Sequence, residues 1–103
     1  MELKECYLKY IHAKDQASKY EFAITKLRNE YAKMITMDSY IKYLYKAKLY
    51  GMIIENMKTI NKVRQYLIDN AGDPMCDNDI KYRAFRANEN IEEYLKLLDE
   101  INQ

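Results

Sequence analysis

The sequence is poor in the residues that form turns: among 103 residues there are two glycines and one proline. So few of them leave little material for β-hairpins, glycine-rich phosphate-binding loops or long linkers. Hydrophobic residues make up 49% of the chain and charged residues 32%, which is not the composition of a disordered protein. A chain of this length has room for one domain, residues 1–103. We therefore expect a single all-helical domain.

The chain also lacks a long apolar run. No stretch approaches the roughly 20 consecutive apolar residues that a membrane-spanning helix needs. The opening "MELKECYLKY" carries charges where a signal peptide would be apolar. Two cysteines without such a signal indicate reduced thiols inside a cell. The sequence predicts a cytoplasmic protein with no membrane partner.

Residues suited to catalysis or metal binding are scarce. Nothing in the pattern brings the single histidine, His12, to a nucleophile and an orienting acid. Cys6 and Cys76 would lie near the same end of an antiparallel hairpin, but too few further ligands accompany them for a zinc site. The aspartates of "DPMCDND" (73–79) lack the glycine and the spacing of a calcium loop. We expect no enzyme, no catalytic or metal-binding residue, no cofactor and no small-molecule ligand.

Helical periodicity is the strongest signal in the chain. Ten positions spaced three and four apart from Leu3 to Met34 are all apolar. This is the pattern of a coiled-coil seam, the stripe of residues that faces a partner helix. The pattern breaks at "TMDS" (36–39), which offers a cap for the next helix, and "NAGDP" (70–74) ends that helix. The sequence predicts an elongated antiparallel three-helix bundle with coiled-coil-like packing and helices at about 3–36, 39–70 and 74–101.

Charge is unevenly distributed along the chain. Residues 1–37 carry seven Lys/Arg against five Asp/Glu, residues 38–72 carry six against three, and residues 73–103 carry four against eight. The formal net charge of +1 gives no general attraction to nucleic acid. We expect the acidic third helix to pack between two mildly basic helices.

The segment "YIKYLYKAKLYGMII" (40–54) is apolar on most of the helix circumference. Burial on several sides would explain this, because tyrosine combines a large contact area with a polar tip. The first helix also carries apolar residues outside its seam. A monomer would expose these side chains, and clustered exposed apolar residues mark partner surfaces. The predicted protein interface consists of Leu8, Ile11, Phe22, Ile41, Tyr45, Leu49 and Met52.

Nucleic-acid binding is the alternative interpretation of the same segment. Interleaved tyrosines and lysines would stack on bases and neutralise phosphates, and "KYRAFRAN" (81–88) repeats the pattern. The contacts would come from Lys42, Tyr43, Lys46, Lys48, Lys81, Arg83 and Arg86. The near-zero net charge and the lack of a helix-turn-helix pair disfavour this interpretation.

The preferred interpretation is a non-enzymatic helical protein–protein interaction module. It would self-associate as a homodimer, bind another protein, or do both. The composition, rich in lysine, isoleucine, asparagine and tyrosine, suggests an accessory or inhibitor protein of a phage or mobile element.

Overall fold

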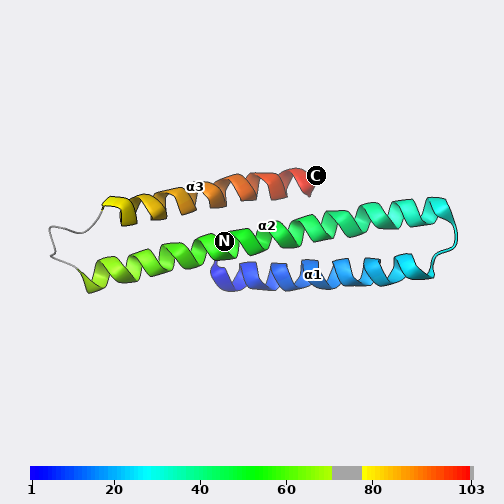
Figure 1. Cartoon of the computed structure of the whole chain (residues 1–103), viewed down its shortest axis with the longest axis horizontal. Helices are drawn as coiled ribbons and strands as arrows, with labels where there is room; N and C mark the ends of the chain where they lie inside the picture. The colour runs from blue at the N-terminus through cyan, green and yellow to red at the C-terminus, as the bar shows by residue number, and fades with distance from the viewer. Residues whose placement is uncertain (71–77, 103) are drawn as a thin grey trace.

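A computed structural model describes residues 1–70 and 78–102 as three helices. α1 spans Leu3–Lys26, α2 spans Glu30–Asp69 and α3 spans Asn78–Ile101. Consecutive helices run antiparallel and form a rod with extents of 66 × 20 × 18 Å (Figure 1). The described residues contain no strand. The predicted all-α, elongated three-helix architecture is confirmed.

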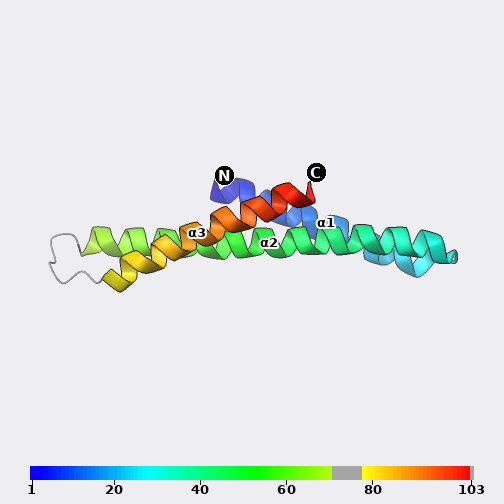
Figure 2. The ribbon, with the colours of Figure 1, turned by 90° about the horizontal axis from the view of Figure 1, so that it is seen from above.

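The central element of the rod is α2. Its 40 residues span about 60 Å, whereas α1 and α3 have 24 residues each. Both shorter helices pack against α2, and within the described ranges no Cα atom of α1 lies within 8 Å of a Cα atom of α3. α3 crosses α2 obliquely (Figure 2). The expectation that the third helix lies between the other two is wrong, because α2 uses different faces for α1 and for α3.

The first turn lies at residues 27–29, about ten residues before the predicted position. Leu27 and Asn29 both have extended backbone conformations. The side-chain oxygen of Asn29 accepts hydrogen bonds from the backbone N–H groups of Tyr31 at 2.8 Å and Ala32 at 3.1 Å. Asparagine is among the best N-cap residues, because these donors have no partner inside the helix. The predicted boundaries 3–36 and 39–70 are therefore corrected to 3–26 and 30–69.

The segment "TMDS" (36–39) does not turn but continues α2. The hydroxyl group of Thr36 donates to the backbone oxygen of Ala32 at 2.8 Å, a bond that keeps this polar side chain inside the helix. Tyr31 and Met34, the last two positions of the predicted seam, belong to α2 and are 68% and 57% exposed. The apolar pattern that suggested one long helix therefore comes from two different surfaces.

The core forms where α2 meets the other two helices. Ile53, near the middle of α2, is fully buried. The buried apolar side chains of the described residues are Cys6, Ala13, Ala17, Ala47, Leu49, Tyr50, Ile53, Ile54, Val63, Ala87, Ile91 and Leu98. Three of them, Ala87, Ile91 and Leu98, belong to α3. They lie on the apolar seam that the three-and-four spacing predicts for the third helix, which consists of Ile80, Ala84, Ala87, Ile91, Tyr94, Leu98 and Ile101. Small residues let α1 approach α2 closely: a Cβ atom on Gly51 would lie 3.3 Å from the ring of Tyr10.

Several predictions on the second turn lie outside the described residues. These are the start of the third helix at residue 74, the helix-ending role of residues 71–74 and the location of Cys76 near Cys6. The end of the second helix is described: α2 ends at Asp69, and the backbone N–H of Asn70 still bonds to the backbone oxygen of Tyr66 at 3.0 Å. This agrees with the predicted end at residue 70.

Replacing Asn29 with alanine tests the position of the first turn. Asn29→Ala leaves the N–H groups of Tyr31 and Ala32 without their side-chain acceptor, so we expect the free energy of unfolding to fall by about 1 kcal/mol. Ser39→Ala is the matched control, because it would remove a cap if the chain turned at residues 36–39. Inside α2 it should leave stability unchanged or raise it by up to about 0.5 kcal/mol. Urea unfolding of both variants measures the difference in the free energy of unfolding. A larger loss for Ser39→Ala than for Asn29→Ala would place the turn at 36–39.

Candidate protein-interaction site

The stripe of α2 that faces α3 continues past the end of α3. Asn90 of α3 donates to the side-chain oxygen of Asn56 at 3.2 Å, which sets the register of the two antiparallel helices. At equal rise per residue, the eleven residues from Asn90 to Ile101 bring the end of α3 to about residue 45 of α2. Figure 1 shows α2 extending beyond that point with only α1 beside it. About 15 residues of α2 therefore have no cover on this side.

Exposure changes along α2 where α3 ends. Under α3, Leu49, Ile53 and Val63 are at most 7% exposed. Beyond it, large apolar side chains are 41–68% exposed. We call this surface the open face of α2; it consists of Tyr31, Met34, Ile35, Met37, Ile41, Leu44 and Tyr45. It covers about half of the helix circumference, with Ile35 and Leu44 at its opposite edges.

The C-terminal half of α2 is uncovered on the side that faces α1. This stripe can be compared with the open face, because its residues are mostly polar where those of the open face are apolar. α1 begins near the middle of α2, where the thiol of Cys6 contacts the backbone of Tyr50. Counting 100° per residue, the α1-facing stripe continues beyond α1 through Lys58, Asn61, Gln65 and Asp69. These residues are all polar and exposed, and Gln65 donates to Asp69 at 2.8 Å. Apart from Ile68, which lies on the same stripe near the end of α2 and is 62% exposed, the chain places polar residues on one uncovered stripe of α2 and apolar residues on the other.

A groove of about 850 Å³ flanks the open face on its α1 side. Ile41, Leu44 and Tyr45 belong to both the groove and the open face. Tyr10 and Ala17 of α1 line the opposite wall. The groove therefore extends the apolar surface sideways from α2 towards α1.

The structure divides the seven predicted interface residues among four places, the last of which, for Leu49, is the core. Ile41 and Tyr45 lie on the open face, 54% and 41% exposed. Leu8, Ile11 and Phe22 are exposed on α1. Met52 is half-buried in the wall of the groove.

Leu49 belongs to the core, because α3 covers its side of α2. It is 3% exposed and lies in one cluster with Ile91 and Leu98 of α3. Its assignment to an exposed contact surface is therefore corrected. Helical periodicity identified the stripe on which Leu49 lies but not the point at which α3 ends.

Sequence reasoning missed five residues of the open face: Tyr31, Met34, Ile35, Met37 and Leu44. Tyr31 and Met34 continue the three-and-four spacing of the first helix, so they were assigned to its seam. The signal that would have separated them is Asn29, a strong N-cap residue followed by Glu30, an acid suited to the first turn of a helix.

The residues proposed to contact nucleic acid do not form one patch. Lys42, Tyr43, Lys46 and Lys48 lie on the first half of α2. Lys81, Arg83 and Arg86 lie at the start of α3, beside the other half, roughly 25 Å away by the helix rise. Arg86 pairs with Glu89 at 2.9 Å. Nucleic-acid binding stays a prediction that no contact in the described residues favours.

The ring of Tyr43 already has partners within the chain. It stacks on Tyr20 of α1 with centroids 5.6 Å apart, and the ammonium group of Lys46 lies 5.1 Å from its centroid. Burial lowers the pKa of Lys46, and the neighbouring charge of Lys42 lowers it further. This tyrosine packs α1 onto α2 rather than presenting a free ring.

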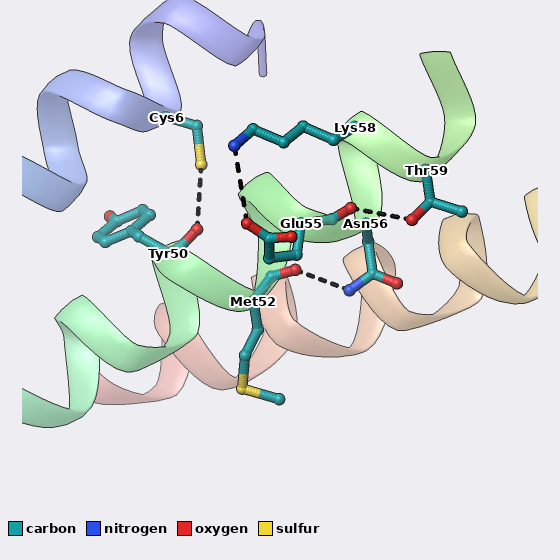
Figure 3. A network of polar contacts seen from close by, with 7 residues as sticks. All are labelled: Cys6, Tyr50, Met52, Glu55, Asn56, Lys58 and Thr59. Carbon is teal, nitrogen blue, oxygen red and sulfur yellow. Dashed lines mark hydrogen bonds and ion pairs between the residues drawn. The ribbon is translucent and has the colours of Figure 1, made fainter. Parts of the chain in front are cut away.

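Cys6 is fully buried between α1 and α2. Figure 3 shows its side chain directed from α1 towards α2, where the thiol donates to the backbone oxygen of Tyr50 at a sulfur–oxygen distance of 3.7 Å. Burial raises the pKa of the thiol, which keeps it protonated and unreactive at neutral pH. The other contacts in this view are an ion pair between Lys58 and Glu55 and two bonds from side chains to backbone oxygens one turn earlier in α2.

The described residues provide no metal centre and no membrane span. Within 1–70 and 78–102, no three His, Cys, Asp or Glu side chains are grouped to hold a metal ion. None of the three helices, as far as they are described, is long and apolar enough to cross a bilayer.

Comparison with known proteins adds no relative. No protein-family model, curated protein sequence or solved structure matches this chain. The open face and its surroundings are therefore the features of the chain that indicate a function.

Thiol labelling tests the buried position of Cys6. In a Cys76→Ser background, Cys6 should react with a disulfide reagent only when the protein opens, because the folded state covers the sulfur and raises its pKa. We expect the labelling rate to follow the unfolding equilibrium across a urea series. Labelling at the rate of a free thiol in native buffer would contradict the contact between Cys6 and Tyr50.

Proposed function

We propose that this chain is a non-enzymatic protein-interaction module that self-associates through the open face of α2. The observation that carries the proposal is the contrast between the two uncovered stripes of α2. The stripe beyond α1 is polar except for Ile68, as expected for a surface that faces water, whereas the stripe beyond α3 is apolar. A polar sequence would satisfy a permanently exposed helix face, so the apolar residues indicate a surface that another chain covers.

The size of the open face supports a stable contact. Its seven side chains are 41–68% exposed, which amounts to roughly 700 Å² if each offers about 200 Å² when fully exposed. Monomeric proteins rarely leave more than about 300–600 Å² of contiguous apolar surface exposed. An interface of standard size buries about 800 Å² per partner. The contact would reach this size only with the flanking groove included, because one partner helix cannot cover both Ile35 and Leu44, which lie on opposite sides of α2.

The composition of the open face also suits a protein partner. Tyrosine and methionine are enriched in interface cores, and lysine is depleted there. Tyr31 and Tyr45 lie at the two ends of the face, and Met34 and Met37 lie between them. The composition of the whole chain favours an accessory protein of a phage or mobile element that acts in the cytoplasm, and this part of the proposal depends on the sequence alone.

Ile41→Glu should abolish self-association. Ile41 is 54% exposed near the centre of the open face, so the substitution leaves the monomer intact but places a charge in the dimer contact. We expect light scattering on a sizing column to give twice the chain mass for the wild type and one chain mass for Ile41→Glu. Both should have the same helical circular dichroism.

Ile68→Glu is the matched control on the same helix. Ile68 is 62% exposed at the far end of α2, so this variant should remain a dimer. A wild-type monomer at every concentration tested would contradict the proposal. So would a dimer that Ile68→Glu disrupts and Ile41→Glu does not. The 260/280 nm absorbance ratio across the same peak would reveal bound nucleic acid, whose release at high salt would favour the alternative function.

A further inference from the structure

We infer that the open face pairs antiparallel with the same face of a second copy, so that the first half of α2 from each chain forms the centre of the dimer. The inference rests on the proposed self-association. It adds the orientation of the two helices, their register and the charged residues that set this register. A two-fold contact uses the same patch on both subunits. The open face meets this requirement because its apolar residues lie on both sides of a midpoint at Asp38.

The spacing of the open face matches the packing already present in the chain. Counting 100° per residue, Tyr31, Met34, Asp38, Ile41 and Tyr45 follow the three-and-four spacing of a coiled-coil seam. The same stripe continues without interruption into the residues that α3 covers, from Leu49 onward. The partner helix would therefore extend a helix–helix interface that α3 already makes with α2.

The direction of α3 favours an antiparallel partner. α3 runs antiparallel to α2 and ends near Tyr45. A second α2 placed antiparallel on the open face would begin near the same point and run in the same direction as α3. The positive N-terminal end of the incoming helix would then lie close to the negative C-terminal end of α3, a favourable arrangement of dipoles. α1 does not obstruct this approach, because it packs on the opposite side of α2.

Two polar residues on the open face would set the register. Asp38 and Lys42 are both exposed and lie on the stripe between Met34 and Tyr45. In an antiparallel pair centred near residue 38, the two Asp38 residues lie opposite each other, and each lies within about one helical turn of Lys42 of the other copy. The two-fold axis produces this opposite-charge pair twice. A charged residue within an apolar seam specifies the register and orientation of helices at some cost in stability.

The outer face of α1 is a weaker candidate for the same contact. Its exposed apolar residues Leu8, Ile11 and Phe22 are separated by Asp15 and Lys19. The ammonium group of Lys26 lies 5.2 Å from the ring centroid of Phe22 and covers part of that ring. Within residues 1–70 and 78–102 no helix packs on this face, so it does not continue an existing interface.

Charge reversal on the intact protein tests the pairing. Asp38→Lys and Lys42→Asp each turn two attractive pairs of the antiparallel dimer into repulsive ones, so each should raise the dimer dissociation constant roughly tenfold. The double variant, or an equimolar mixture of the two single variants, should regain wild-type affinity. Analytical ultracentrifugation measures the constants. Asp15→Lys and Lys19→Asp, with the same spacing on the outer face of α1, are the matched controls and should have no effect.

Other outcomes would separate the orientation of the two helices from self-association itself. Unchanged affinity in all single variants would contradict the register centred near residue 38. A parallel pair in register would place Asp38 equally close to Lys42 of the other copy, so charge reversal does not distinguish the two directions; a dimer no longer than one rod by small-angle X-ray scattering would indicate the parallel pair. That result would overturn the antiparallel pairing while self-association stands. A loss of affinity in the α1 controls would move the contact to α1 and overturn the inference. A wild-type monomer would overturn both this inference and the proposed function.

Discussion

The difference in length between α2 and its two neighbours determines most features of this molecule. A helix of 40 residues is packed against two helices of 24 residues each, and the two shorter helices begin and end at different points along it. Helical stability in proteins comes mainly from packing of an apolar face. Beyond the part of α2 that α1 covers, the α1-facing stripe of α2 is mostly polar. Beyond the end of α3, the α3-facing stripe of α2 stays apolar and forms the open face.

The middle of the rod, where all three helices lie alongside one another, contains the tightest packing. Ile53 and Cys6 are fully buried there, and the small residues of the α1 seam bring α1 close to α2. The thiol of Cys6 has a hydrogen-bond partner and a pKa raised by burial, so its role is that of a small core residue. The distal end of the α1–α2 hairpin has less cover, and a second copy would give that end the third and fourth helices that the chain itself does not supply.

Periodicity alone predicted the three helices and much of the core. Ala87, Ile91 and Leu98 lie buried where the spacing of the third helix placed them. Periodicity could not locate the first turn, because Asn29 is a single capping residue within an unbroken apolar pattern. The same limit explains the error at Leu49 and the omission of Tyr31 and Met34. A stripe of apolar residues indicates that something covers it, but only the positions of the helix ends show whether that cover comes from the same chain.

Small-angle X-ray scattering over a concentration series tests most directly whether a second copy covers the open face. A single chain is a rod of 66 Å. Two rods that overlap antiparallel over about 16 residues near one end should reach a maximum dimension of roughly 100 Å at twice the chain mass. A particle of one chain mass and 66 Å at all concentrations would contradict the account. So would a dimer no longer than one rod, because it would place the two chains side by side along their whole length.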